Sequence, residues 1–168
     1  MHDISAELVA CIPRLRRYAR ALVGDRTAAD ALVQDTLERA WTKLSLWQRG
    51  TDMRAWLFGI MHNLRINQVR KPVLPTVPLD DEDADLTGSA TESAQLDLRD
   101  LESALARLPV EQREVLLLVA LESMSYEEVA RALCIPAGTV MSRLARGREK
   151  LRVIMEGKPL VSPLKVVK

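Results

Sequence analysis

The 168-residue chain carries 24 basic and 23 acidic side chains, and the resulting net charge of +1 by itself argues against a nucleic-acid binder. A hydrophobic content of 48% is enough for a packed core and excludes wholesale disorder. No apolar run reaches the about 18 residues of a membrane span, and Asp3 and Glu7 interrupt any signal-peptide pattern. Cys11 and Cys134 lie far apart without Cys or His at ligand spacing, so we expect a cytoplasmic protein with no metal and no cofactor.

The charge is unevenly distributed along the chain. Residues 1–71 carry a net charge of +5, residues 72–100 a net of −7, and residues 101–168 a net of +3. Two basic blocks are therefore separated by an acidic segment that hides them in the total. A block of like charge is typical of a solvated spacer, which is our interpretation of the acidic segment.

Helical periodicity dominates the first 24 residues. Apolar side chains recur at three- and four-residue steps from Leu8 to Leu22, which predicts a helix that ends at Gly24. Pro13 lies inside this pattern, so we expect the helix to kink or restart there.

Two further helices are predicted before residue 72. Thr27 and Asp30 resemble a capping box for a helix that reaches about Leu44. A turn at residues 50–52 follows, and we interpret Asp52 as the cap of a third helix. That helix should end at Lys71, because a proline follows.

Residues 72–94 combine three prolines, an acidic run and small polar residues, a composition that leaves nothing to pack. We interpret them as a flexible acidic linker between helical domains at residues 1–71 and 95–157, with a C-terminal tail at residues 158–168. The predicted fold class is all-α, with two small helical domains.

The second domain contains a predicted helix-turn-helix. Ser125 and Glu128 form a capping box for a short helix, and residues 135–138, with Pro136, end it and turn the chain. The helix that follows has a small or apolar face and a face of Thr139, Ser142, Arg143 and Arg146. A solvated helical hairpin is the plain alternative, but the basic face is suited to the DNA major groove.

Motifs in both domains resemble bacterial RNA polymerase sigma factors. Residues 30–41, residues 50–60 and Asn63 resemble the first conserved domain (region 2), and residues 105–115 with the helix-turn-helix resemble the second (region 4). The absence of other domains is typical of the short extracytoplasmic-function (ECF) group. The resemblance implies a non-enzymatic factor that binds core polymerase, recognises the minus-35 and minus-10 promoter elements and initiates transcription of a specific regulon.

The resemblance assigns a polymerase-docking role to the second helix. It implies contact with the coiled coil of the largest subunit, while the second domain would meet the polymerase flap. The residues implied in docking on the coiled coil are Leu32, Val33, Gln34, Asp35, Glu38 and Trp41. Ala31 departs from the acidic residue usual in the family, which removes one polar contact.

The resemblance also assigns promoter contacts. Asn63 and Asn67 would hold an unpaired base, because an amide both donates and accepts hydrogen bonds. The full set implied for the minus-10 element is Met53, Asn63, Arg65, Asn67, Arg70 and Lys71. At Trp56 and Phe58 the helical spacing favours core packing over base stacking, and His62 is interpreted as a surface residue.

For the minus-35 element, the implied residues lie on the recognition helix. They are Thr139, Ser142, Arg143, Arg146 and Arg148. Asp52 and Met141 also depart from the family pattern, Asp52 because an acid lies where Asn is common.

An anti-sigma protein is a further partner implied by the resemblance. Two alternatives remain open: a sigma-like decoy that sequesters an anti-sigma protein, and a stand-alone helix-turn-helix regulator. Known decoys carry a receiver domain that this length would exclude, and a stand-alone regulator would not need the helix at residues 30–41.

Overall fold

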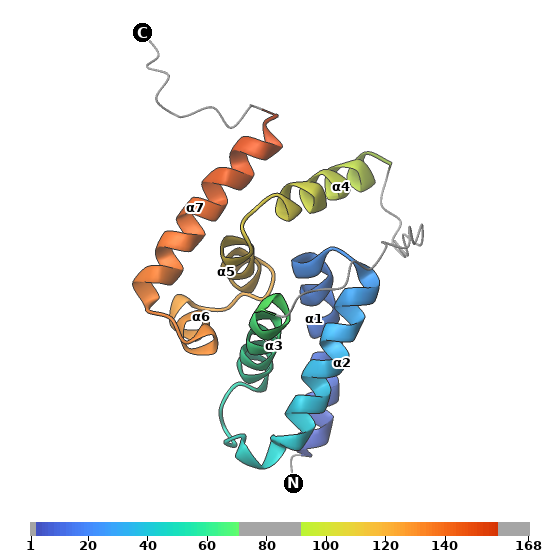
Figure 1. Cartoon of the computed structure of the whole chain (residues 1–168), viewed down its shortest axis with the longest axis vertical. Helices are drawn as coiled ribbons and strands as arrows, with labels where there is room; N and C mark the ends of the chain where they lie inside the picture. The colour runs from blue at the N-terminus through green and yellow to red at the C-terminus, as the bar shows by residue number, and fades with distance from the viewer. Residues whose placement is uncertain (1–2, 71–91, 158–168) are drawn as a thin grey trace.

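The computed structural model describes residues 3–70 (the first half) and 92–157 (the second half), and all regular structure within them is helical (Figure 1). The first half contains α1 (Ile4–Val23), α2 (Arg26–Thr42), the short 3₁₀ helix η1 (Leu44–Leu46) and α3 (Met53–Arg70). The second half contains α4 (Glu92–Ala106), α5 (Val110–Ala120), α6 (Tyr126–Leu133) and α7 (Ala137–Met155). The predicted all-helical class is confirmed for these residues.

Side-chain caps fix the ends of α1 and the start of α2. The Asp3 carboxylate accepts a hydrogen bond from the Ser5 N–H at 3.0 Å, and α1 ends at Gly24, which has a φ of 83°. The helix runs through Pro13 without a second start. The predicted capping box at Thr27 is wrong, because Asp25 lies two residues earlier and accepts the N–H of Thr27 itself.

The third helix begins as the sequence predicted. The Asp52 carboxylate accepts the N–H of Arg54 at 3.0 Å, which satisfies one of the free donors of the first turn. Lys71 and most of the predicted linker lie outside the described residues. The last three residues of that predicted linker, 92–94, belong to α4 instead.

The helix-turn-helix forms with a shifted turn. Ser125 caps α6 by accepting the N–H of Glu128 at 3.1 Å, as predicted. The helix ends at Cys134, whose φ of 55° is left-handed, so the turn comes earlier than residues 135–138. Ala137 and Gly138 therefore open α7, directly after Pro136.

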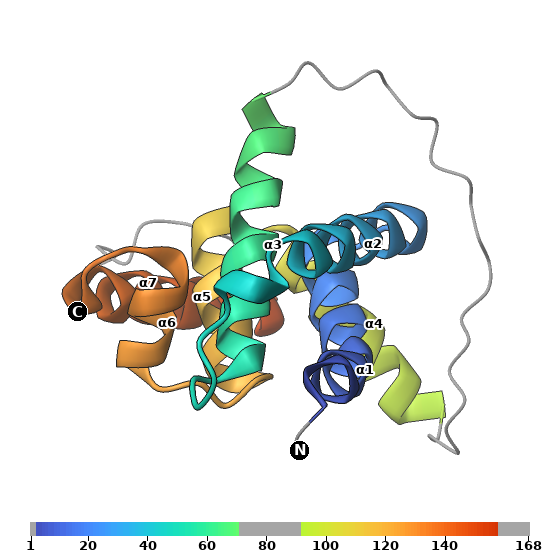
Figure 2. The ribbon, with the colours of Figure 1, turned by 90° about the horizontal axis from the view of Figure 1, so that it is seen from below.

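The two halves pack against each other around one core. α3 lies between α2 on one side and α6 on the other, and α1 contacts α4 and α5 (Figures 1 and 2). The buried apolar side chains form a single cluster that extends from Leu8 in α1 to Leu144 in α7. Phe58 lies in it with its ring 4.7 Å from that of Tyr18, so its predicted core role is confirmed.

Candidate nucleic-acid and protein interfaces

One face of α2 is buried and the other is exposed. Leu32, Val33, Thr36 and Ala40 lie in the core, where the Thr36 hydroxyl donates to the Leu32 carbonyl at 2.7 Å. Leu32 and Val33 were expected to dock on polymerase, but both side chains are buried in the core and neither lies on the exposed face of α2. The docking role of these two residues stays a prediction that their burial does not support.

The exposed face of α2 carries the other four docking candidates. Gln34, Asp35 and Glu38 are exposed, and Gln34 donates to Glu38 at 3.5 Å. The Trp41 side chain is 60% exposed although it is large and apolar. Amide, acid and aromatic groups therefore share one strip, which we call the α2 strip (Gln34, Asp35, Glu38 and Trp41).

On α3, the two asparagines lie one helical turn apart and are both exposed. Ile66, between them on the surface, is also exposed. Arg65 is half-buried on another side of the helix, where its Nε has no hydrogen-bond partner. Met53 is buried in the core at the start of α3, so the predicted DNA contact at Met53 does not agree with its position.

Two other minus-10 candidates are beyond what the structure describes. Arg70 is the last residue of α3, and its side chain lies outside the described part, as does all of Lys71. The described minus-10 surface thus rests on Asn63 and Asn67.

The recognition helix α7 presents its two predicted faces. Val140, Leu144 and Gly147 are buried, and a Cβ at Gly147 would lie 3.4 Å from Gln112 of α5. On the other face Ser142 and Arg146 are exposed, whereas Thr139 and Arg143 are half-buried. Those four residues form the α7 face.

Arg148 does not join that face. It is exposed, but at about 100° per residue it lies roughly half a revolution from Thr139 around the helix. Of the five minus-35 candidates, the helix brings four together and turns Arg148 away.

His62 and Cys134 occupy environments that the sequence did not predict. His62 is paired with Glu114 of α5 and its side chain is only 14% exposed, so its interpretation as a surface residue is wrong. The Cys134 thiol is exposed at the end of α6. No local sequence signal could have found the His62–Glu114 pair, because its members are 52 positions apart.

Buried charge gathers where the halves meet. Glu114 and Glu122 are both buried, and Tyr18 lies near them. Burial first, and then these two carboxylates, raise the pKa of Tyr18 well above its usual range. Within the described ranges no group of three or more His, Cys, Asp or Glu side chains is arranged to hold a metal ion. None of the helices described there is long and apolar enough to cross a membrane.

Both halves match known families. Residues 8–62 match the family model of the sigma2 domain of PhyR, and residues 98–151 match that of sigma-70 region 4. The ECF RNA polymerase sigma factor EcfG of Rhodopseudomonas palustris is 36% identical over 155 residues, which cover 89% of this chain and 83% of that protein.

Solved structures share the fold. The sigma factor RpoE, in complex with the anti-sigma factor NepR from Bartonella quintana, is 31% identical with a TM-score of 0.76, covering 93% of this chain and 98% of that one. CnrH, in complex with the cytosolic domain of CnrY, is 26% identical with a TM-score of 0.68, covering 93% and 89%.

A sigma2-type half joined to a region 4 helix-turn-helix defines a sigma-type transcription initiation factor. The chain belongs to the ECF RNA polymerase sigma factors. The family and the function expected from the sequence are confirmed.

Proposed function

We propose that this cytoplasmic, non-enzymatic sigma factor docks on core polymerase through the α2 strip and uses α3 and the α7 face to contact the minus-10 and minus-35 elements. The observation that carries this proposal is the different chemistry of the three exposed helical faces. The α2 strip is acidic and aromatic, the α3 surface is rich in amides, and the α7 face carries arginine. Each chemistry suits a different partner.

The α2 strip suits a basic protein surface. Asp35 and Glu38 would attract cationic side chains on the coiled coil of the polymerase's largest subunit. An exposed tryptophan such as Trp41 buries a large area on binding, which is typical of residues that dominate interface energies. The second half would then meet the polymerase flap.

The α3 surface suits unpaired DNA. Amide side chains at Asn63 and Asn67 can hydrogen-bond the edge of a base that has left the duplex. Holding such a base offsets the few kcal/mol that unstacking costs, and strand opening becomes favourable.

The α7 face suits the major groove. Arg146 can pair with guanine, Ser142 can bond a base or a phosphate, and the N-terminal end of α7 favours a phosphate. In helix-turn-helix proteins the first turns of the second helix lie in the major groove, which supports this role for the α7 face.

An anti-sigma protein is a further proposed partner. The relatives RpoE and CnrH were solved in complexes with NepR and with the cytosolic domain of CnrY. Since this chain shares their fold over most of its length, we expect a protein of that kind to bind it.

A decoy is the second candidate function, because residues 8–62 match a domain of PhyR. PhyR from Bartonella quintana is an anti-anti-sigma factor that was solved with NepR, and at 18% identity it shares the fold alone. A decoy would bind an anti-sigma protein without supporting transcription. A stand-alone regulator would instead bind promoter DNA without polymerase.

Adding the purified chain to core polymerase and scoring promoter-dependent transcription tests these candidates. We expect a stable complex and run-off product. Asp35→Lys should weaken core binding at least about tenfold, because it puts like charge against a basic partner. The matched control is Glu102→Lys on the exposed side of α4, which should bind normally. A chain that does not bind core would contradict the proposal.

A further inference from the structure

Met141 is a large apolar side chain that α7 does not bury. It is 52% exposed, although Val140 before it and Leu144 three residues later are buried in the core. These two neighbours fix the orientation of the helix, so the fold itself directs Met141 toward solvent. One exposed methionine is ordinary on a protein surface. This one lies within the first two turns of α7, where the proposed minus-35 contacts begin.

Met141 and Arg146 lie on opposite edges of the exposed side of α7. At about 100° and 1.5 Å per residue, they are about 140° apart around the helix and about 7.5 Å apart along it. The exposed residues between them in the first three turns are small: Gly138, Ser142 and Ala145. The exposed side of α7 therefore has a basic edge at Arg146, a centre of small residues and an apolar edge at Met141.

Gly138 suits a helix whose backbone comes close to a large partner. Its φ is not positive, and a Cβ added there would meet nothing within 4 Å in the described part of the chain. Neither backbone conformation nor packing there requires glycine, which is a poor helix former. Glycine is also used where a backbone approaches a ligand closely. The centre of the exposed side is thus suited to deep entry into a groove.

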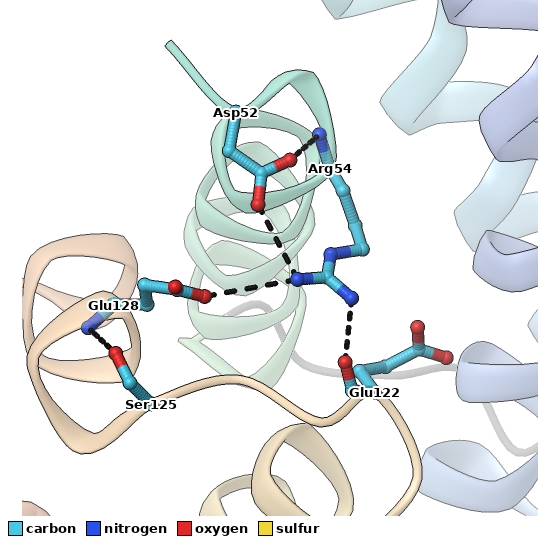
Figure 3. Close-up of polar contacts among 5 residues, drawn as sticks. All are labelled: Asp52, Arg54, Glu122, Ser125 and Glu128. Carbon is cyan, nitrogen blue, oxygen red and sulfur yellow. Dashed lines mark hydrogen bonds and ion pairs between the residues drawn. The ribbon is translucent and has the colours of Figure 1, made fainter.

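The start of α6, the helix before α7, is held by contacts on two sides (Figure 3). Ser125 accepts the N–H of Glu128 at 3.1 Å, and the Glu128 carboxylate lies 3.7 Å from Nη2 of Arg54 in α3. Nη1 of the same arginine donates to the Glu122 carbonyl, three residues before the cap, at 2.6 Å. Because α6 is anchored and the turn after it is short, α7 has a defined direction and Met141 a defined place on the surface.

The chemistry of an apolar side chain in the major groove matches one base. Thymine carries its 5-methyl group there, and apolar side chains are the groups that contact it. Guanine, adenine and cytosine are recognised in the major groove by hydrogen-bonding groups, which a thioether satisfies poorly. Methionine is also unbranched and adaptable, so it can follow a methyl group whose exact position varies. Met141 is therefore suited to thymine.

Both edges of α7 can be used at the same time. The major groove is about 12 Å wide, and a helix with its side chains is about 10 to 12 Å in diameter. Side chains on the edges of the exposed side therefore face the two walls of the groove. Since Arg146 and Met141 differ in both angle and height, they would read different base pairs.

Arg148, which lies off the α7 face, falls on the same edge as Met141. Seven residues separate the two, so Arg148 is about 20° away around the helix and about 10.5 Å further along it. It is exposed. Arginine at the wall of a groove is suited to a phosphate, and phosphate contacts fix the register of a protein on the duplex.

We propose that Met141 reads the methyl group of a thymine in the minus-35 element, with the Ala145 methyl beside it and Arg148 on a neighbouring phosphate. The inference rests on the proposed contact between α7 and the minus-35 element. It adds a thymine to the guanine that Arg146 is suited to read, so the two edges of the helix together specify more of the sequence than the α7 face alone.

Replacing thymine with deoxyuridine tests this contact, because it removes only the 5-methyl group. The factor bound to core polymerase first selects its preferred minus-35 element from duplexes randomised at that element. Each thymine of the selected duplex, on either strand, is then replaced in turn, and competition binding is measured at fixed salt. We expect one replacement to weaken binding by the parent factor about two- to fivefold, the effect of burying one methyl group.

Met141→Ala should abolish that difference, leaving the thymine and deoxyuridine duplexes within about 1.5-fold of each other, because the methyl group has lost its apolar partner. The matched control is Met155→Ala, which changes another exposed methionine in the last turn of the same helix and should keep the full difference. Arg148→Ala should weaken all duplexes about equally and reduce the salt dependence of binding.

Three results would overturn the inference: no replacement that weakens the parent factor, an equal loss in the parent and in Met141→Ala, or a preferred element without an A·T pair. Circular dichroism checks that the variants retain their helices. A polymerase-bound factor that prefers no minus-35 sequence to a scrambled one would contradict the proposed function of α7. A factor that keeps a preference dependent on Arg146, but shows no methyl effect, would contradict only the role of Met141.

Discussion

Arg113 illustrates how one buried charge can organise a helix end. It is 8% exposed and donates to three carbonyls at the end of α4, those of Leu105, Ala106 and Leu108, at 2.7 to 2.9 Å. A fourth bond, of 2.6 Å, reaches the Leu22 carbonyl in α1. Burial first, and then a neighbouring arginine, lower the pKa of Arg113. The planar guanidinium can serve four acceptors at once, since it carries five N–H groups.

Replacing Arg113 with Met should therefore cost about 3 to 5 kcal/mol of unfolding free energy, because three buried carbonyls and one part-buried carbonyl lose their donor. Urea denaturation followed by circular dichroism measures the change. Arg107→Met, at an exposed position six residues earlier, should shift stability by less than about 0.5 kcal/mol. Arg113→Lys should recover only part of the lost stability. Full recovery would show that the planar set of guanidinium N–H donors is not required for stability.

At the residue scale, prediction from sequence succeeded where the partner is local. Asp52 caps the helix that starts at the next residue, so two positions of sequence were enough to predict it. His62 and Glu114 are 52 positions apart, and each looks like an ordinary surface residue in its own helix. Their burial is a consequence of tertiary packing, which helical periodicity does not encode.

At the scale of the element, α6 ends in a strained conformation. Cys134 is left-handed, with φ 55° and ψ 45°, and its N–H bonds back to the last turn of α6. A residue with a Cβ is destabilised by about 1 kcal/mol or more in the left-handed region of backbone conformations, whereas glycine is not. The short turn of the helix-turn-helix imposes this geometry whatever residue occupies it.

Cys134→Gly should consequently stabilise the protein by about 0.5 to 1 kcal/mol, after allowing for the extra freedom of glycine in the unfolded chain. Thermal unfolding should show a midpoint about 1 to 4 °C higher. Cys134→Ala keeps the Cβ and should give no such gain. Equal midpoints for the two variants would mean that the left-handed geometry is not strained.

The recognition helix carries a second expectation at this scale, because its arginines are not equivalent. Arg152 donates to Glu149 at 2.6 Å and to Glu156 at 2.8 Å, and these bonds raise its pKa. Arg152 is therefore paired with acidic side chains of its own helix. Arg146, on the α7 face, is exposed, and it is the arginine for which we propose a base contact.

Arg146→Ala in the polymerase-bound factor should lose about 1 to 3 kcal/mol of binding at a matched minus-35 sequence and little at a scrambled one. Competition binding with both duplexes at fixed salt measures the preference. Arg152→Ala should leave the preference unchanged. If Arg146→Ala weakened both duplexes equally, it would be a phosphate contact rather than a base contact.

Element boundaries were predictable to within a few residues, and the misses have physical causes. The start of α2 was missed because Asp25 and Thr27 are both good caps, and only the structure shows which one accepts the free N–H groups. The structure separates the predicted docking residues of α2 into buried and exposed ones. The family motif could not do so, because it gives sequence positions but not the side of the helix on which each residue lies. Leu32 and Val33 were grouped with Gln34 for that reason.

At the scale of the whole molecule, sequence motifs identified two domains but not their contact. Each half has a helical pattern and a family model of its own. The contacts between them, such as Arg17 with Glu122 and Gly59 with Ala132, join positions more than 70 residues apart. Because the buried cluster is continuous across both halves, folding of one half should depend on the other.

That dependence can be measured with the tryptophans, because all three, Trp41, Trp47 and Trp56, lie in the first half. Tryptophan fluorescence therefore follows the first half, whereas far-ultraviolet circular dichroism follows the helices of both. One cooperative unit requires the two thermal transitions to coincide, and we expect coincidence in the parent chain. Gly59→Ala should separate them, because it weakens the contact between the halves while favouring α3 itself. Separate transitions in the parent chain would instead mean that the continuous core contributes little coupling energy, and that the two halves are already independent before polymerase is present.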